Sequence, residues 1–316
     1  MAKYTVKRLL QSVLTVLIIA TLVFLMMRML PNEYYFSEEQ LMKLTDEQKE
    51  DILTAAGLND PIMVQLMRFY GELLTFNLGT SRRIQVGVPV LELVGSKFGI
   101  SMKMGLISLG ISLVIGVLTG VIQAMYKDKL PDHIGTAYTV FVRAVPTLVS
   151  YSLVLAFGAW VLGLPSLYSR RNPVGSSILP IVCLSMGSIA YYALWSRRYM
   201  VDEMNKDYIK LAKVKGMSSR DIMFKHVLKN AFVPLAQYIP ASFLLTIGGS
   251  LLVERFFSIP GMGTLMTDAI GRYDTSVVQA CVIIYASLGV LGVFLGDVLM
   301  MLLDPRIKLT GKGETR

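Results

Sequence analysis

The sequence predicts an all-α polytopic membrane protein with six transmembrane helices. Of its 316 residues, 53% are hydrophobic and only 17% are charged, whereas charged residues make up about a quarter of a typical soluble domain. Six stretches free of Asp, Glu, Lys and Arg are each about as long as the 20 residues that cross a bilayer. Lys and Arg are concentrated in alternate connections, which is typical of the cytoplasmic side of membrane proteins.

The first uncharged stretch, residues 9–27, follows a short basic N-terminus. A signal peptide begins in the same way, but its apolar core has only about 7–15 residues and ends at a small-residue cleavage site. This stretch instead runs on into "RMLPN". We therefore predict a cytoplasmic N-terminus at 1–8 and an uncleaved transmembrane helix within 9–30.

Segment 31–98 follows the first span and carries ten acidic and six basic residues. "TDEQ" at 45–48 is a capping-box pattern with Thr45 as the N-cap. A second helix is expected over "NDPIMVQLMRFYGELLTF", with Asp60 as its N-cap and Pro61 in its first turn. We expect a small extracytoplasmic helical segment that lies as a cap on the outer membrane face.

Residues 99–303 form the predicted core, with five further spans of 22 to 25 residues. These spans are 104–126, 144–168, 174–196, 230–253 and 275–296. Each must be a helix, because backbone groups in lipid have to satisfy one another. Pro146 and Pro240 lie inside two spans and are expected to kink them. The GxxxG patterns at 116–120 and 292–296 permit close helix contacts.

Six spans place both termini on one side, and charge identifies that side. Segment 197–229 holds nine Lys and Arg residues against four acids, and the tail 304–316 adds four more basic residues. The positive-inside rule therefore makes both termini and the connection between spans four and five cytoplasmic.

Several classes of function lack support in the sequence. The net charge of +9 is explained by cytoplasmic loops, and no nucleic-acid-binding motif accompanies it. Cys183 and Cys281 lie in apolar runs and predict neither a disulfide framework nor a zinc site. No HExxH and no GxxxxGK[ST] occurs, so we expect no metal or cofactor on this chain and no ATP hydrolysis by it. Asp297, near the cytoplasmic end of the last span, is either a functional acid or the partner of a nearby arginine.

The cytoplasmic loop 201–229 has the pattern of two short helices joined by a glycine turn. Residues 203–215 contain no Gly or Pro, and Gly216 is suited to a left-handed C-terminal cap. Ser218 then provides an N-cap for a second helix, with Asp221 three residues later. Apolar residues are expected to be exposed at its tip, where they would need a partner surface. They are Ile222, Met223, Val227 and Leu228.

This loop, "YIKLAKVKG" followed by "HVLKNAFVPL", resembles the cytoplasmic EAA loop of ABC-transporter permeases, in the form found in dipeptide and oligopeptide permeases. The resemblance continues in order along the chain, at "KRLLQSVLTVLIIATLVFLMMRMLP", "AGLNDPIMVQLMRFYGELLTFNLGTS", "GGSLLVERFFSIPGMG" and "LLDPRIK". It is closest to the B-type subunit, which has an N-terminal span and a helical outer loop. Lys210 stands where the general motif has glutamate, and Asn32 replaces the usual glycine.

The resemblance implies a type I ABC importer permease fold in which the loop docks in a cleft of a cytoplasmic ATPase. The loop positions assigned to this coupling are Asp207, Tyr208, Ala212, Lys213, Lys215, Gly216, Ser218, Arg220, His226 and Asn230. The motif at 248–263 has two readings, a plain turn or a short loop that reaches toward the translocation path or a binding protein. Its residues are Glu254, Phe257, Pro260, Gly261 and Gly263.

The function implied by the resemblance is one half of the membrane channel of an ATP-driven importer of di- or oligopeptides. A second related permease, two cytoplasmic ABC ATPases that hold ATP and Mg, and an extracytoplasmic solute-binding protein would be its partners. The chain would lie in the plasma (inner) membrane of a prokaryote, surrounded by lipid. Uptake of nickel, glutathione or oligosaccharides remains open within the family. An ATP-independent secondary transporter is the alternative from another class, and the absence of an inverted repeat disfavours it.

Overall fold

The computed structural model describes residues 2–247 and 250–303, and in these ranges the chain is helical apart from turns and one isolated bridge between Thr80 and Pro89. Five helices are long and apolar enough to cross a membrane, or six if one sharply bent pair counts as a span. The predicted all-α fold class is confirmed. Gly248 and Gly249, and the tail 304–316 with most of the C-terminal signature, lie outside the described residues.

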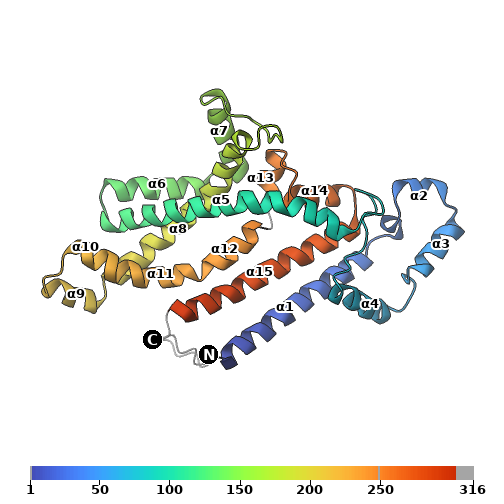
Figure 1. Ribbon diagram of the computed structural model, residues 1–316, viewed down its shortest axis with the longest axis horizontal. Coiled ribbons are helices and arrows are strands. Elements are labelled where there is room, and N and C mark those ends of the chain that lie inside the picture. The colour runs from blue at the N-terminus through green and yellow to red at the C-terminus, as the bar shows by residue number, and fades with distance from the viewer. Residues whose placement is uncertain (1, 248–249, 304–316) are drawn as a thin grey trace.

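The long helices are α1 (Ala2–Arg28), α5 (Val90–Met125), α8 (Ile178–Met204) and α15 (Thr275–Leu303). Helix α8 packs along α5, α15 packs along α1, and α12 (Tyr238–Ile247) contacts both α5 and α15. The start of α1, the end of α15 and the short helices α9 and α10 lie toward one side, and α2–α4 lie toward the other (Figure 1). The remaining elements are η1 (Asn32–Tyr35), α2 (Glu38–Lys43), α3 (Asp46–Ala55), α4 (Ile62–Leu74), α6 (Leu130–Ala144), α7 (Thr147–Trp160), η2 (Gly175–Ser177), α9 (Asp207–Val214), α10 (Ser219–Asp221), η3 (Ile222–Val227), α11 (Leu228–Ala236), α13 (Leu251–Phe256) and α14 (Met262–Gly271).

Both GxxxG patterns lie at helix contacts, as predicted. A Cβ atom at Gly116 would come within 2.7 Å of the Cβ of Tyr192, and one at Gly120 within 2.5 Å of the Cβ of Ser196. At Gly292 a Cβ atom would come within 2.6 Å of the Cα of Ala241. These glycines therefore set how closely α5 approaches α8 and α15 approaches α12.

The predicted span over 144–168 does not form as one helix, and α7 covers only Thr147–Trp160 of it. The chain forms α6 and α7 there, and their axes differ by 115°. Pro146 is the N-cap of α7, and the break at this point follows from its missing N–H and from the restriction it places on the preceding residue. The kink expected at Pro146 is confirmed, but the helix before it starts already at Leu130 and packs on α5 and α8.

The predicted span over 230–253 is also divided, at Gln237, where α11 ends and α12 begins. From there Tyr238–Phe256, which includes α12 and α13, is one of the candidate spans. Pro240 lies in the first turn of α12, where a proline is tolerated because no helical partner precedes its nitrogen. The proline therefore accompanies the start of a helix rather than a kink inside one.

The outer helical segment forms as predicted between the first two spans, with one error in its details. The backbone N–H of Gln48 donates to Thr45 Oγ1 (3.3 Å) and that of Thr45 to Gln48 Oε1 (3.0 Å), which confirms the capping box. Asp60 is not the N-cap of α4, because Pro61 occupies that position. The Asp60 carboxylate instead pairs with Arg68 at 2.7 Å.

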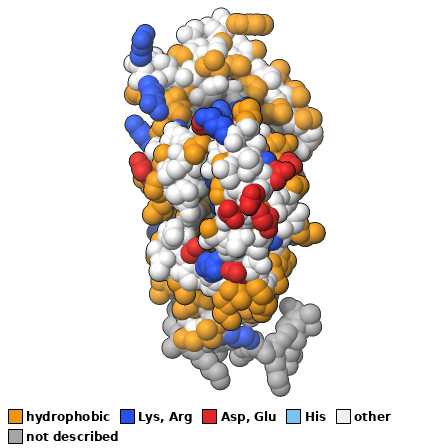
Figure 2. Space-filling view, turned by 90° about the vertical axis from the view of Figure 1, so that its right-hand side faces the viewer, with side chains coloured by type: hydrophobic (Ala, Val, Ile, Leu, Met, Phe, Trp, Pro, Cys, Tyr) orange, Lys and Arg blue, Asp and Glu red, His pale blue; other side chains and the backbone are white. Residues whose placement is uncertain are grey.

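Helix α4 packs against the side of α1. The rings of Phe24 and Phe69 stack with centroids 5.2 Å apart, and the hydroxyl of Tyr70 donates to the carbonyl of Leu17 (3.2 Å) and contacts Thr21. Since Leu17 and Thr21 lie within the apolar run of α1, α4 packs beside the C-terminal half of that helix. The location of this segment on the outer membrane face stays a prediction. Figure 2 views the molecule from the side on which α2–α4 lie and shows acidic side chains near the middle of that face.

Candidate functional site

The coupling segment, residues 207–230, begins with α9 and a tightly specified turn. Gly216 has φ +77°, and the N–H of Gly216 donates to the carbonyl of Lys213 (3.0 Å). The N–H of Met217 donates to the carbonyl of Ala212 (3.2 Å). This pair of bonds is a Schellman motif with glycine at C′, which confirms the predicted cap.

The second helix of the segment starts at its predicted cap. Ser218 Oγ accepts from the N–H of Asp221 (3.1 Å) and donates to its carboxylate (2.7 Å). Lys225 pairs with the same carboxylate at 2.6 Å, and together these contacts hold the pKa of Asp221 below its ordinary value. Residues 222–227 then continue as a π-helix, a form that is rare and often marks functional positions.

The apolar residues expected to be exposed at the tip are mostly buried. Ile222, Met223 and Val227 are 4%, 9% and 0% exposed, and they pack with Val121, Ala124 and Met200 from the ends of α5 and α8. Leu228 is half-buried. The expectation was wrong because the sequence did not reveal the π-helix, which turns these residues onto the membrane-spanning helices. The segment is therefore fixed to the core of the protein.

A polar network joins the two arms of the segment. The hydroxyl of Tyr208 donates to the Glu203 carboxylate, and Asn230 Nδ2 donates to the Tyr208 oxygen at 2.8 Å. Partial burial and the Glu203 carboxylate raise the pKa of Tyr208 to about 12, so this hydroxyl keeps its proton at any physiological pH. Two of the predicted coupling residues, Tyr208 and Asn230, thus position the segment.

The outward surface of the segment combines apolar and basic side chains. Leu211, Val214 and Phe224 are 54%, 84% and 47% exposed, and the predicted contact residues Lys213 and Lys215 are exposed beside them. Of the other predicted residues, Ala212 is buried, His226 is half-buried, and Arg220 and Asp207 are exposed. Asp207 pairs with Lys210 at 2.8 Å, which lowers the pKa of the Asp207 carboxyl.

The outer motif is built around the carboxylate of Glu254, which is only 3% exposed. Its Oε2 accepts from the N–H groups of Gly263 (2.7 Å) and Thr264 (3.3 Å) in the first turn of α14. Its Oε1 accepts from Ser101 Oγ at 2.6 Å, and Ser101 Oγ in turn accepts from the N–H of Met262 at 2.8 Å. Glu254 and Ser101 therefore cap α14 in place of Gly261, its N-cap, which has no side chain.

The glycines of this motif are explained by close contacts. A Cβ at Gly261 would lie 2.5 Å from Glu254 Oε2, and one at Gly263 would lie 2.8 Å from the Cα of Leu251. Phe257 is fully buried and Pro260 is half-buried. The structure brings the five predicted residues of the motif together in one packed turn, and their role as a gate stays a prediction.

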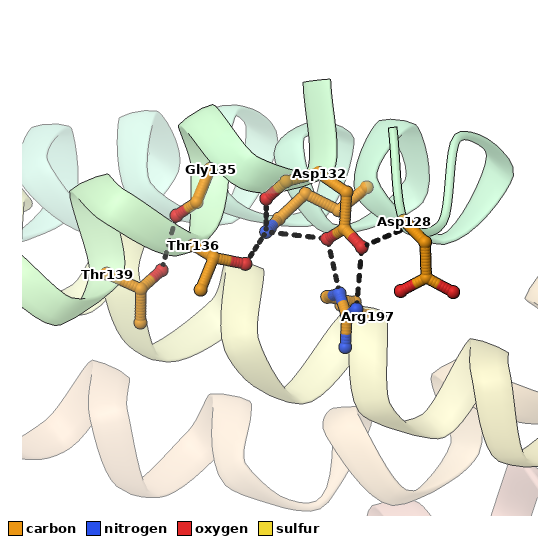
Figure 3. Close-up of polar contacts among 7 residues, drawn as sticks. Asp128, Asp132, Gly135, Thr136, Thr139 and Arg197 are labelled. Carbon is orange, nitrogen blue, oxygen red and sulfur yellow. Dashed lines mark hydrogen bonds and ion pairs between the residues drawn. The ribbon is translucent and has the colours of Figure 1, made fainter. Parts of the chain in front are cut away.

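An ion pair that the sequence reasoning missed joins α6 to α8 (Figure 3). Arg197 binds Asp132 through Nε–Oδ1 (2.6 Å) and Nη2–Oδ2 (2.7 Å), and the Asp132 carboxylate also accepts from the N–H of Asp128 (2.9 Å). Gln123 Nε2 donates to the carbonyl of Asp132 (3.3 Å) and to Thr136 Oγ1 (3.3 Å). Asp132 is 2% exposed and the Arg197 side chain 28%, so this is a partly buried, bidentate contact among three helices.

Asp297 forms a second ion pair between helices. Its Oδ2 lies 3.3 Å from Nε of Arg8, and its Oδ1 accepts from Gln237 Nε2 at 3.0 Å. Of the two options left open by the sequence, the structure favours pairing with an arginine. Within residues 2–247 and 250–303, no group of three or more His, Cys, Asp or Glu residues is arranged to hold a metal ion.

Comparisons with known proteins agree with this architecture. Residues 114–309 match the family model described as binding-protein-dependent transport system inner membrane component. The chain is 34% identical to the dipeptide transport system permease protein DppB of Lactococcus lactis subsp. cremoris, over 98% of this chain and 100% of that protein. It is 30% identical to the oligopeptide transport system permease protein OppB of Salmonella typhimurium, over 98% and 100% of the two chains.

The fold is also similar to a solved structure. A chain of the inward-facing MetNI methionine ABC transporter matches with a TM-score of 0.52, at 17% identity, over 67% of this chain and 96% of that one. At this identity the likeness shows the shared fold alone.

Proposed function

The chain belongs to the family of binding-protein-dependent transport system inner membrane components, and on this premise we propose that it is a permease subunit of an ATP-driven importer of di- or oligopeptides. The observation that carries the proposal is the full-length match to dipeptide and oligopeptide permeases at 30–34% identity. The protein is a multi-pass membrane protein.

We propose that the exposed surface of the coupling segment docks on a cytoplasmic ATPase. The segment exposes the apolar side chains of Leu211, Val214 and Phe224, and the exposed Lys213 and Lys215 flank Val214 in the sequence. An exposed apolar patch ringed by charge is typical of protein interfaces. Because the inner side of the same segment is packed on α5 and α8, a movement of the ATPase would be transmitted to the membrane helices.

The rest of the assembly follows from the same proposal. A second permease completes the translocation path, two ATPases bind ATP and Mg, and an extracytoplasmic binding protein delivers the peptide. The coupling segment then faces the cytoplasm, together with the start of α1 and the end of α15 (Figure 1). Nickel, glutathione and oligosaccharides are the alternative cargoes, and an ATP-independent transporter is the alternative mechanism.

Affinity purification in mild detergent tests the docking surface. The tagged wild-type chain should co-purify with an ATPase, whereas Val214→Asp should lose it, because the substitution buries an unpaired charge in the interface. Val174→Asp is the matched control, since Val174 is 76% exposed, similar to Val214, but lies in the connection between α7 and η2. An ATPase retained by Val214→Asp, or lost equally by both variants, would contradict the proposed surface.

A further inference from the structure

A cavity of about 170 Å³ lies where the outer helical segment meets α1 and α15. Its walls come from the outer end of α1, from η1 and α4, from the loop before α5 and from the first turns of α15. A space of this volume holds roughly ten water molecules. It is separate from the coupling segment and from the packed turn around Glu254.

Two arginines with no carboxylate partner line this cavity. The guanidinium carbons of Arg28 and Arg82 lie 5.4 Å and 5.0 Å from the centroid of the same ring, that of Tyr35. Neither arginine forms an ion pair within the described parts of the chain, and the only hydrogen bond of the Arg28 guanidinium there is to the Tyr35 hydroxyl (3.1 Å). Like charges gathered in this way repel one another, so an anion between them is favourable.

Polar groups of the cavity wall also lack partners. Nη1 of Arg82, Nε2 of Gln279 and Oε1 of Gln65 are buried and form no hydrogen bond with any of the residues that the structure describes. Two of these atoms are donors and one is an acceptor, and buried polar atoms without partners cost free energy. Arg68 also lines the wall but is occupied by Asp60, and Glu72 is the one acidic side chain among the described lining residues.

The loop that carries Arg82 is held in place by hydrogen bonds to the carboxylate of Asp274. Asp274 Oδ2 accepts from the N–H groups of Arg82 (3.1 Å), Arg83 (2.9 Å) and Ile84 (3.1 Å), and from Ser81 Oγ (2.6 Å). Burial lowers the pKa of Arg82, and Arg28 adds to this effect, while Tyr35 and Asp274 oppose it. The Asp274 carboxylate accepts from backbone N–H groups and Ser81 and forms no ion pair with the Arg82 guanidinium, so the structure fixes the backbone of an arginine that has no ion-pair partner among the described residues.

Part of the cavity wall is apolar and comes from helices beside the first candidate span. Phe24 and Phe69 line it beside the arginines. Helix α4, which supplies Phe69 and packs on α1 through the Phe24–Phe69 contact, also carries Met63 and Met67, which are 63% and 73% exposed. A ligand of this site is therefore expected to combine an oxyanion with apolar chains.

We infer that the cavity binds the phosphate of an outer-leaflet phospholipid, with Arg28, Arg82 and Gln279 as its donors and the aromatic wall against its glycerol and acyl chains. The assignment to the outer leaflet rests on the orientation given with the proposed function, whereas the site itself is additional to transport and does not require it. Bound lipid would join α4 to α1 and α15, and so fasten the outer helical segment to the membrane core.

The test measures the melting temperature of the full-length chain in detergent with added dioleoylphosphatidylglycerol, and counts retained lipid by native mass spectrometry. Wild type should retain one lipid and gain thermal stability, and Arg28→Gln with Arg82→Gln should weaken binding at least tenfold. Arg83→Gln is the matched control, because Arg83 is on the same loop but stacks on Tyr34 and does not line the cavity. Ser276→Phe fills the cavity while keeping both arginines, so it tests the site even if the double variant does not fold.

Three outcomes would overturn the inference. Equal lipid binding by wild type and Ser276→Phe would remove the cavity as the site. Equal stabilisation by dioleoylglycerol, which has no phosphate, would remove recognition of the charge. Equal stabilisation by inorganic phosphate at the same concentration would replace the lipid by a free anion.

Discussion

The turn at Gly216 offers the sharpest perturbation of the coupling segment. Gly216 has φ +77°, and a Cβ placed there would meet no atom within 4 Å. Gly216→Ala therefore introduces backbone strain without a clash, and the left-handed conformation costs an L-residue about 1–2 kcal/mol. If docking needs the native turn, the docking-competent fraction falls and the apparent Kd for the ATPase rises by up to about 5- to 30-fold.

Gly216→Pro should have a larger effect. Proline fixes φ near −65° and removes the N–H that donates to the carbonyl of Lys213 at 3.0 Å, so the turn cannot form. We expect the protein to insert in the membrane but to lose ATPase docking and coupled transport.

The assay is binding of the purified ATPase to detergent-solubilised variants, measured as a Kd. Gly163→Ala is the control, because Gly163 has φ +65°, also has open space where a Cβ would lie, and is in the turn after α7. It should cost the same local strain and leave the Kd unchanged. Wild-type affinity in both Gly216 variants would refute the reasoning that the turn sets the docking geometry.

Three further predictions concern stability and are checked by thermal unfolding in detergent. Asp132→Asn should destabilise the protein by about 1–3 kcal/mol, because it leaves the partly buried Arg197 guanidinium without its carboxylate partner. Adding Arg197→Gln should cost less than the sum of the two single changes, and strict additivity would contradict a direct pair. Gly120→Ala should cost about 1–3 kcal/mol, because its Cβ would lie 2.5 Å from a side chain of α8, while Gly110→Ala, with open space, should be neutral or stabilising; equal melting temperatures would refute the tight contact. Glu254→Gln should cost about 1–3 kcal/mol, because the NH₂ of the new amide must face either the Ser101 hydroxyl or the N–H groups of Gly263 and Thr264. An unchanged melting temperature would show that the carboxylate is not needed as a cap.

Local features of this fold followed from the sequence where one short pattern decides the geometry. The capping box at Thr45, the Schellman turn at Gly216, the cap at Ser218 and the two GxxxG contacts all depend on residues within one or two turns of each other. The number of apolar stretches, and the Lys and Arg residues between them, likewise predicted a polytopic membrane protein, because both can be read directly from the sequence. These features were therefore predictable without any knowledge of the tertiary structure.

The errors arose where tertiary contacts decide. Residues 130–144 are polar enough at their start to suggest a loop, yet α6 forms there because Asp132 binds Arg197, 65 positions along the chain. The only sequence signal for this ion pair was a charged residue at the end of an apolar run, as at Arg197. A single sequence does not reveal which residue such a charge pairs with. The burial of Ile222 and Met223 likewise depends on a π-helix, and π-helices have no simple sequence signature.

The central claim is that this chain couples ATP hydrolysis by a partner to movement of a peptide. The measurement that tests it most directly is uptake of a labelled dipeptide into proteoliposomes that contain the complex purified through this chain, with its binding protein supplied on the outer side and ATP on the other. The account predicts uptake that requires ATP and is lost in Gly216→Pro. Uptake that proceeds equally without ATP, or that is unchanged in Gly216→Pro, would contradict it.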